Sequence, residues 1–292
     1  MERYIGTALF TVFSFMATVV GQQVKSPDLS QEHLLSSEQG KNYLIKVQLP
    51  ITYQDSIDYP VLYYLDAWWL EDSVVGAFTL LQGSRKVRAA ILVGISTTGN
   101  EYEFNKQRTR DYTPTPFEME KLGFPMVIFS QPKFFEITRG NSGSSELFTS
   151  FLTNILFPFI DGTYNTDIKD RSILGHSLGG LFGIHNLSSA QPTFDNYISI
   201  SPSLWWIKDD NYYESLYRNF SNEVSKKKLF LCYGSSEGLL ITTWTDKLNE
   251  YLLTKGLPVD HFKFVKYPDE DHTSVLPESI YEGLEFLYGY SK

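Results

Sequence analysis

Cysteine is nearly absent from this chain, since Cys232 is the one cysteine among 292 residues. A single thiol excludes an intrachain disulfide framework and a zinc site made of several cysteines. Basic side chains are also outnumbered, with 25 Lys and Arg against 34 Asp and Glu and a formal net charge of −9. An acidic chain without a basic stripe lacks the charge that neutralises phosphates, so we expect no nucleic-acid binding.

Motifs for metals and nucleotides are missing as well. The sequence contains no HExxH, P-loop or dinucleotide fingerprint, and its five histidines have no metal-ligand spacing. Neither a metal nor an organic cofactor is therefore implied. The chain also has no internal repeat, charge run or low-complexity linker.

Apolar residues, by contrast, are plentiful. They make up 42% of the chain, and 15% of all residues are aromatic, against 20 glycines and 13 prolines. This balance predicts a packed core rather than a disordered or collagen-like chain. The length suits one large α/β domain or two small ones.

The N-terminus carries an uncharged run from residue 4 to residue 24, directly after Arg3. Its modest length, its Thr, Ser and Gly content, and the small residues before Gln22 favour a secretory signal peptide over residues 1–21. An uncleaved membrane anchor or a buried helix is the alternative. We predict a secreted or periplasmic protein whose residues 22–292 form a single domain with no membrane span.

From residue 42 onward, short apolar runs alternate with amphipathic stretches, which is typical of a mostly parallel sheet covered by helices. The run 43–49 alternates in polarity as an edge strand does, whereas several later runs are continuously apolar as central strands are. The predicted strands are 43–49, 60–66, 89–95, 171–176, 196–201, 228–234 and 262–267, and the predicted helices are 71–82, 145–160, 178–190, 210–224, 241–255 and 277–290.

One segment, about 96–143, interrupts this pattern and contains four prolines. A connection of that length is usually functional or mobile, so we interpret it as a loop or lid beside a site. An insertion with a small core of its own is the alternative.

The sequence GHSLG at residues 175–179 matches the nucleophile elbow G-x-S-x-G, in which small residues permit a sharp strand-to-helix turn that exposes a serine. The sequence GSSEG at 234–238 matches it too. Hydrolases of this type place the serine, then the acid, then the histidine after successive strands. Three strands follow Ser177 but only one follows Ser236, so we predict that Ser177 is the nucleophile.

A serine hydroxyl needs a base to remove its proton, and imidazole has a suitable pKa. His272 is the one histidine of the five that follows the last predicted strand at its carboxyl end. Glu237, just after strand 228–234, is the best placed carboxylate to orient the imidazole. Asp269 and Asp271 would need an unusual turn to reach the ring of His272.

An oxyanion hole of two backbone N–H groups should accompany such a serine. Leu178, the residue after the nucleophile, supplies the first. Ala67 or Trp68, in the turn after strand 60–66, supplies the second.

Other side chains near the predicted site have two interpretations each. Arg108 and Arg110 either bind an anionic or catechol-bearing substrate or form ion pairs with Asp111 or Glu103 that order the loop. Trp205 and Trp206 form either an aromatic wall of the site or plain core. Together with Trp68, Trp69 and the Phe-rich stretch 117–135, they predict an aromatic-lined pocket near Ser177.

Six stretches of the sequence, taken in order, carry a family resemblance: VLYYLD (61–66), RTRDYTP (108–114), RSILGHSLGGLFGIHNL (171–187), YISISPSLWW (197–206), the Gly-x-x-Glu turn at 234–237 and DEDHTSVLPESIYEGL (269–284). Together they resemble the esterase branch of the α/β-hydrolase superfamily, which contains esterase D, siderophore esterases, feruloyl-type esterases and mycolyltransferases. The resemblance covers about residues 40–290. The chain departs from the family at Ala67, where the family commonly has glycine, and in the apolar insertion 122–138.

The resemblance implies an α/β-hydrolase fold and a serine esterase, with Ser177, His272 and Glu237 as its triad and a small-molecule ester as its substrate. Siderophore, feruloyl and other acyl esters are the substrates that the resemblance suggests. Two alternatives stay open: acyl transfer to an alcohol by the same acyl-enzyme, and a binding module whose catalysis has lapsed.

Overall fold

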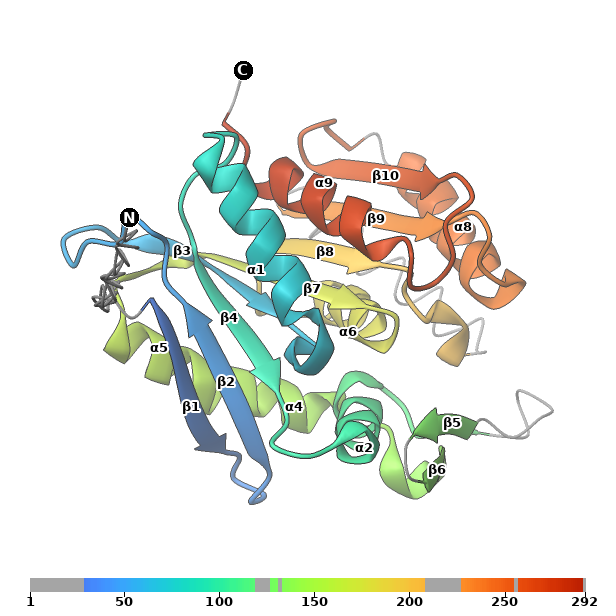
Figure 1. Ribbon diagram of the computed structural model, residues 1–292. Coiled ribbons are helices and arrows are strands. Elements are labelled where there is room, and N and C mark those ends of the chain that lie inside the picture. Colours follow the sequence, from blue (N-terminus) through green and yellow to red (C-terminus); the bar gives the residue numbers. More distant parts are fainter. Residues whose placement is uncertain (1–28, 119–126, 131–132, 208–226, 255–256, 291–292) are drawn as a thin grey trace, which may run out of the picture.

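An eight-stranded mixed sheet forms the centre of the computed structural model, which describes residues 29–118, 127–130, 133–207, 227–254 and 257–290 (Figure 1). Its strand order is β1-β2-β4-β3-β7-β8-β9-β10. β1 pairs antiparallel with β2 and β2 with β4, and every other neighbouring pair is parallel. The strands are β1 (Ser30–Ser36), β2 (Asn42–Gln48), β3 (Tyr59–Tyr64), β4 (Ile91–Ser96), β7 (Thr166–His176), β8 (Asn196–Ile200), β9 (Lys228–Gly234) and β10 (Phe262–Tyr267).

The burial of each strand follows its sequence. All residues of β3 and β4 are buried, as expected for continuously apolar strands covered on both faces. β2 alternates, but the prediction that it lies at the sheet edge was wrong, because β1 pairs along its outer side. β1 escaped the sequence analysis because SQEHLLS is largely polar, and none of its residues is fully buried.

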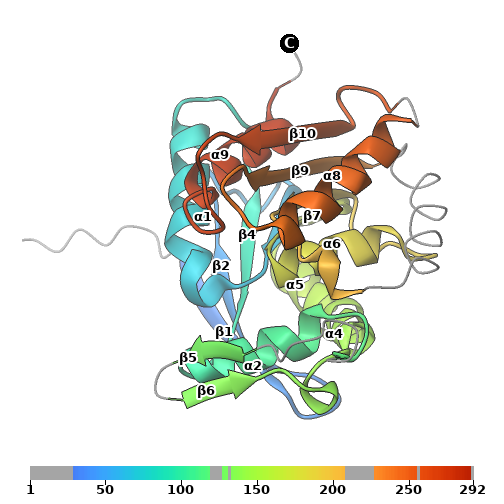
Figure 2. The ribbon, with the colours of Figure 1, turned by 90° about the vertical axis from the view of Figure 1, so that its right-hand side faces the viewer.

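Helices cover both faces of the sheet (Figure 2). The buried side chains of α1 (Ala67–Gly83) and α9 (Leu276–Tyr288) form one core cluster with one face. The other face carries the second cluster, to which these helices contribute: α4 (Ser145–Phe151), a π-helical turn (Leu152–Leu156), α5 (Phe157–Thr163), α6 (Leu178–Leu187) and α8 (Leu239–Leu253). The predicted helix 210–224 lies outside the described residues.

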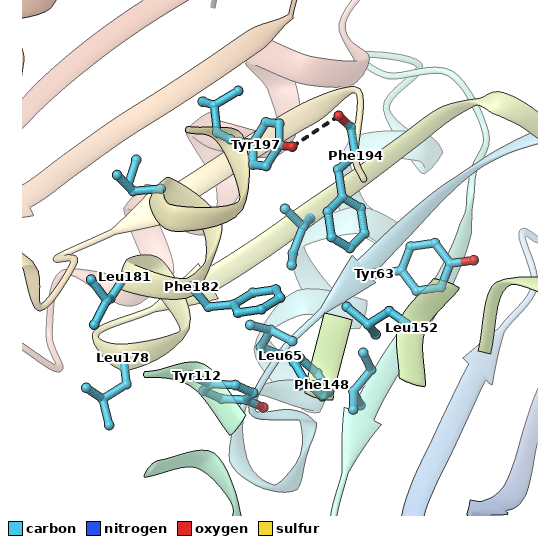
Figure 3. Close-up of a cluster of buried hydrophobic side chains, with 14 of the residues drawn as sticks. Tyr63, Leu65, Tyr112, Phe148, Leu152, Leu178, Leu181, Phe182, Phe194 and Tyr197 are labelled. Carbon is cyan, nitrogen blue, oxygen red and sulfur yellow. Dashed lines mark hydrogen bonds between the residues drawn. The ribbon is translucent and has the colours of Figure 1, made fainter. Parts of the chain in front are cut away.

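The larger core is rich in aromatic rings (Figure 3). Phe182 on α6 is fully buried, and its ring lies 5.1 Å from that of Phe148. The hydroxyl of Tyr197 lies 2.9 Å from Asn186 Oδ1 and 3.1 Å from the carbonyl oxygen of Phe194, so this buried phenol has acceptors for its one proton. Burial of one such aromatic side chain contributes roughly 2–3 kcal/mol, which fixes α6 and the turn before it against the sheet.

Residues 96–143 are not simply a loop, which corrects the sequence interpretation. They include α2 (Glu101–Tyr112), whose N-cap Asn100 accepts a hydrogen bond from Glu103 N, and a hairpin of β5 (Val127–Ser130) and β6 (Lys133–Glu136). The hairpin lies beside α2, apart from the central sheet, in both views (Figures 1 and 2). The helix was missed because EYEFNKQRTRDY is too polar to show an apolar face.

In the described part of the chain, no helix is both long and apolar enough to cross a membrane.

Candidate active site

The three residues predicted as the triad follow the carboxyl ends of parallel strands. Ser177, Glu237 and His272 come shortly after β7, β9 and β10. Asp66 and Ser201, which were not predicted as site residues, come directly after β3 and β8 in the same sheet. Because these strands are parallel, the segments after them meet at one edge of the sheet, where α/β proteins bind their ligands. Residues that are far apart along the chain therefore lie at the same edge of the sheet.

Ser177 occupies a strained turn between β7 and α6, with φ 59° and ψ −113°. Glycines make this turn possible. A Cβ on Gly175 would lie 2.3 Å from the backbone carbon of Gly179, and one on Gly180 would lie 3.0 Å from the carbonyl oxygen of Ile200. The sequence GHSLGG thus allows α6 to start close against β7 and β8, with Ser177 at the tip of the turn.

Replacing Gly175 with alanine should distort this turn. The new methyl group meets backbone rather than a flexible side chain, so we expect a loss of about 3 kcal/mol in the free energy of unfolding and a large loss of activity. Thermal denaturation and ester hydrolysis measure the two effects. Gly76→Ala is the matched control. Gly76 is an exposed residue mid-way along α1, and nothing lies within 4 Å of a Cβ built there. Its replacement should raise the free energy of unfolding by roughly 0.5–1 kcal/mol. Equal stability of the two variants would contradict the steric argument.

His272 and Glu237 form a close pair. Nδ1 of His272 lies 2.6 Å from Oε2 of Glu237, whose side chain is only 1% exposed. The other carboxylate oxygen, Oε1, accepts from the Ser201 hydroxyl at 2.5 Å and from the Gly234 amide at 2.8 Å. Three donors therefore hold one buried carboxylate in a fixed orientation.

The loop that carries His272 packs tightly on the end of β9. A Cβ on Gly234 would lie 2.2 Å from the carbonyl oxygen of Glu270, so glycine is needed for this approach. The amide of Ser236 donates to the same carbonyl at 2.9 Å. These backbone contacts bring the segment before His272 alongside Glu237.

His176 supports the same loop from the other side. Its Nε2 lies 2.8 Å from the carbonyl oxygen of His272, and the two rings are 4.4 Å apart. A carbonyl only accepts, so this nitrogen carries the proton. Burial and the neighbouring His272 lower the pKa of His176 well below its usual value, which keeps its ring neutral. His272 was predicted as the base because it follows the last strand, but its contact with His176 was not foreseen from the sequence.

Ser203 is a neighbour that the sequence analysis missed. Its hydroxyl lies 3.2 Å from that of Ser177, and its amide donates to the carbonyl of Ser177 at 3.0 Å. The available signal was the sequence Ser201-Pro202-Ser203, which directly follows β8 at the same sheet edge as the elbow.

The turn after β3 lies beside the elbow. Asp66 has φ 58° and precedes α1, and a Cβ on Gly179 would lie 3.5 Å from Asp66 Oδ2. Ala67 and Leu178 are the first residues of α1 and α6, where amides have no partner within the helix. The positive φ falls on Asp66 rather than on Ala67, so alanine in place of the family's glycine needs no unusual backbone conformation at that position.

Both arginines of the RTRDYTP segment are held by internal ion pairs. Arg108 donates twice to Asp66, at 2.9 Å each, and once to the carbonyl of His176 at 3.4 Å. Arg110 donates to both oxygens of Asp111, at 2.6 and 2.9 Å. Asp111 and Glu103 were the partners weighed for both arginines from the sequence; Arg110 pairs with Asp111, but the pairing of Arg108 with Asp66 was not foreseen. Arg108 thus connects the turn after β3 with the residue before Ser177.

A groove of about 470 Å³ lies over Ser177. Trp205 is on its wall, whereas Trp206 packs against Phe117 and donates to the carbonyl of Thr115. It is lined by Ser177, Ser203, Trp205, Glu237, Gly238, Leu239, Leu240, Ile241 and His272.

Trp68 and Trp69, the other two tryptophans of the predicted aromatic pocket, make separate contacts. The ring of Trp69 meets the edge of His176 at 5.7 Å, and Trp68 stacks on Phe104 at 5.1 Å. Neither is among the described residues that line the groove. Within the same described ranges, no three of His, Cys, Asp or Glu are grouped closely enough to hold a metal ion.

Comparison with known proteins identifies the chemistry. A family model described as "Putative esterase" matches residues 129–267. Ferri-bacillibactin esterase BesA of Bacillus subtilis is 29% identical over 283 residues, which cover 89% of either chain. The crystal structure of the BES protein from Bacillus cereus superposes with a TM-score of 0.75 and 27% identity, covering 94% of this chain and 100% of the other. This chain is an esterase of the α/β-hydrolase type.

Further relatives of the esterase agree with this assignment. Siderophore triacetylfusarinine C esterase of Aspergillus fumigatus is 24% identical, over 89% of this chain and 93% of its own. The enterobactin and salmochelin hydrolase IroE, at 22% identity and a TM-score of 0.63, shares the fold. The fold and the ester-hydrolysing activity predicted from the sequence are thereby confirmed.

Proposed function

We propose that the esterase is a serine carboxylester hydrolase in which Ser177 is the nucleophile, His272 the general base and Glu237 the residue that orients His272. The observation that carries this proposal is the 2.6 Å contact between His272 Nδ1 and the buried Glu237 carboxylate, in the groove that contains Ser177. A neutral imidazole whose Nδ1–H donates to a carboxylate has Nε2 free to accept a proton.

The reaction then proceeds by acyl-enzyme chemistry. As Ser177 Oγ attacks the ester carbonyl, its proton passes to His272 Nε2, and the amides of Leu178 and of Ala67 or Trp68 stabilise the oxyanion. The C–O bond to the alcohol breaks as His272 returns the proton to the leaving oxygen. Water, deprotonated by His272, then attacks the acyl-enzyme and releases the carboxylic acid and free Ser177.

The names of the relatives suggest the first substrates to test. They include a ferri-bacillibactin esterase and a triacetylfusarinine C esterase, so siderophore esters join feruloyl esters as candidates for this chain. We also propose that residues 1–21 act as a secretory signal and that residues 22–292 work as one exported domain. The first 28 residues lie outside the described ones.

Covalent labelling tests the nucleophile directly. A fluorophosphonate probe reacts with an activated serine to form a stable adduct, and we expect one probe per chain on the tryptic peptide containing Ser177. Ser177 and Ser203 lie on the same tryptic peptide, residues 172–208, and their hydroxyls are only 3.2 Å apart. Fragmentation of the labelled peptide in tandem mass spectrometry assigns the adduct to one serine or the other. Adducts on Ser203 alone, or no adduct on the folded protein, would contradict the assignment.

A further inference from the structure

The groove over Ser177 has an apolar wall that the proposed mechanism does not use. The first turn of α8 supplies Leu239, Leu240 and Ile241 to this wall, and Trp205 lies in the same groove. Leu239 is 81% exposed and Leu240 is 37% exposed. These large apolar side chains therefore present their surface to the groove without a described side chain covering them fully.

The position of the two leucines is tied to the proposed catalytic residues. Gly238 alone separates Glu237 from Leu239, and Glu237 is fixed by its bonds to Ser201, Gly234 and His272. Single exposed leucines are common on protein surfaces. Here, however, adjacent leucines lie on the same groove as Ser177, which is the position expected of residues that contact a substrate.

The groove offers little to an anion. Among the described residues that line it, none is lysine or arginine. Arg108 and Arg110 are engaged by Asp66 and Asp111. The whole chain has a formal net charge of −9, which further disfavours an anionic ligand.

We propose that this groove binds an uncharged apolar group of the ester substrate, with Leu239, Leu240 and Trp205 as its binding wall. The inference rests on the proposed function, since it assumes that the scissile ester lies at Ser177. Each methylene that the wall removes from water favours binding, so esters with longer uncharged chains react faster than acetates. The volume of about 470 Å³ is within the range of small-molecule sites.

The proposal is tested by measuring how kcat/KM of the whole protein depends on the length and the charge of the ester. We expect kcat/KM for p-nitrophenyl hexanoate to exceed that for the acetate by about tenfold or more, since four methylenes are added. A p-nitrophenyl hemisuccinate, which carries a carboxylate, should react at least about tenfold more slowly than the butyrate of equal length. A second pair of substrates, hexyl acetate and methyl acetate, tests whether the wall binds the alcohol part of the ester rather than the acyl part. A gain in either pair supports the proposal, and a gain in neither overturns it.

The double variant Leu239→Ser/Leu240→Ser tests the residues themselves. We expect the ratio of hexanoate to acetate turnover, or of hexyl to methyl acetate, to fall about fivefold or more. Leu253→Ser is the matched control, because Leu253 is 65% exposed at the far end of the same helix and should leave the ratio unchanged. Equal ratios in the two proteins would overturn the assignment of the wall.

A different measurement would contradict the proposed function itself. If acetate hydrolysis survives in Ser177→Ala, then Ser177 is not the nucleophile, whatever the chain-length dependence. If hydrolysis requires Ser177 but is insensitive to chain length on both sides of the ester, the mechanism stands and the apolar binding site is rejected.

Discussion

Ser177→Ala is expected to lower kcat/KM for p-nitrophenyl acetate by roughly 10,000-fold, to a residual rate due to binding and oxyanion stabilisation alone. Alanine removes the attacking oxygen but keeps Cβ, so the turn at φ 59° is no more strained than before. The elbow should therefore keep its shape. Steady-state kinetics on the purified variant, with its melting temperature compared with that of the parent, measures the effect.

Ser236→Ala is the matched control for this experiment. Ser236 is the central serine of the second G-x-S-x-G match, and it is exposed just after β9. Its replacement should leave kcat/KM unchanged, because only one strand follows it along the sheet. Hydrolysis that is lost in Ser236→Ala and kept in Ser177→Ala would reverse the assignment.

Glu237→Gln is expected to lower kcat by roughly 1,000- to 10,000-fold with little change in structure. The hydroxyl of Ser201 and the amide of Gly234 both donate to Oε1, so the glutamine carbonyl should take that position. The glutamine NH₂ then faces His272 Nδ1 as a donor. The imidazole must accept there and carry its proton on Nε2, which is the tautomer that cannot deprotonate Ser177.

Asp269→Asn separates this effect from a general loss of negative charge near His272. Asp269 is exposed, and its φ of 61° suits asparagine well, so we expect full activity. Asp269 and Asp271 were the other acids near His272 in the sequence. An active Glu237→Gln combined with an inactive Asp269→Asn or Asp271→Asn would move the orienting role to the loop.

The sequence predicted which residues lie at the sheet edge around Ser177 better than it predicted the contacts between them. Ser177, Glu237 and His272 could be selected because each follows a predicted strand, and parallel strands bring such positions together. The bond between Arg108 and Asp66 spans 42 residues and leaves no periodic signal, so it could not be read from the sequence. The same holds for the 3.2 Å approach of Ser203, which depends on how the turn after β8 folds back.

Two secondary-structure elements were not predicted from the sequence for similar reasons. β1 and α2 were missed because their residues are largely polar, and pairing with β2 or packing beside α4 and α6 holds them in place. The apolar strands and the amphipathic helices were found because their periodicity reports burial directly. Tertiary contacts thus determine the secondary structure of segments whose own sequence pattern is weak.

Backbone strain in this protein has a consequence for engineering its thermostability. Of the five non-glycine residues with positive φ in the described ranges, four lie at the sheet edge that carries the candidate site: Asp66, Ser177, Ser201 and Asp269. Each such residue costs on the order of 1 kcal/mol or more, which glycine would relieve. A search for stabilising substitutions would therefore be drawn to this edge. Glycine at position 177 would remove the proposed nucleophile, and glycine at position 201 would remove a hydroxyl that donates to Glu237. Stabilising changes are better sought at exposed helical glycines such as Gly76, which does not line the groove.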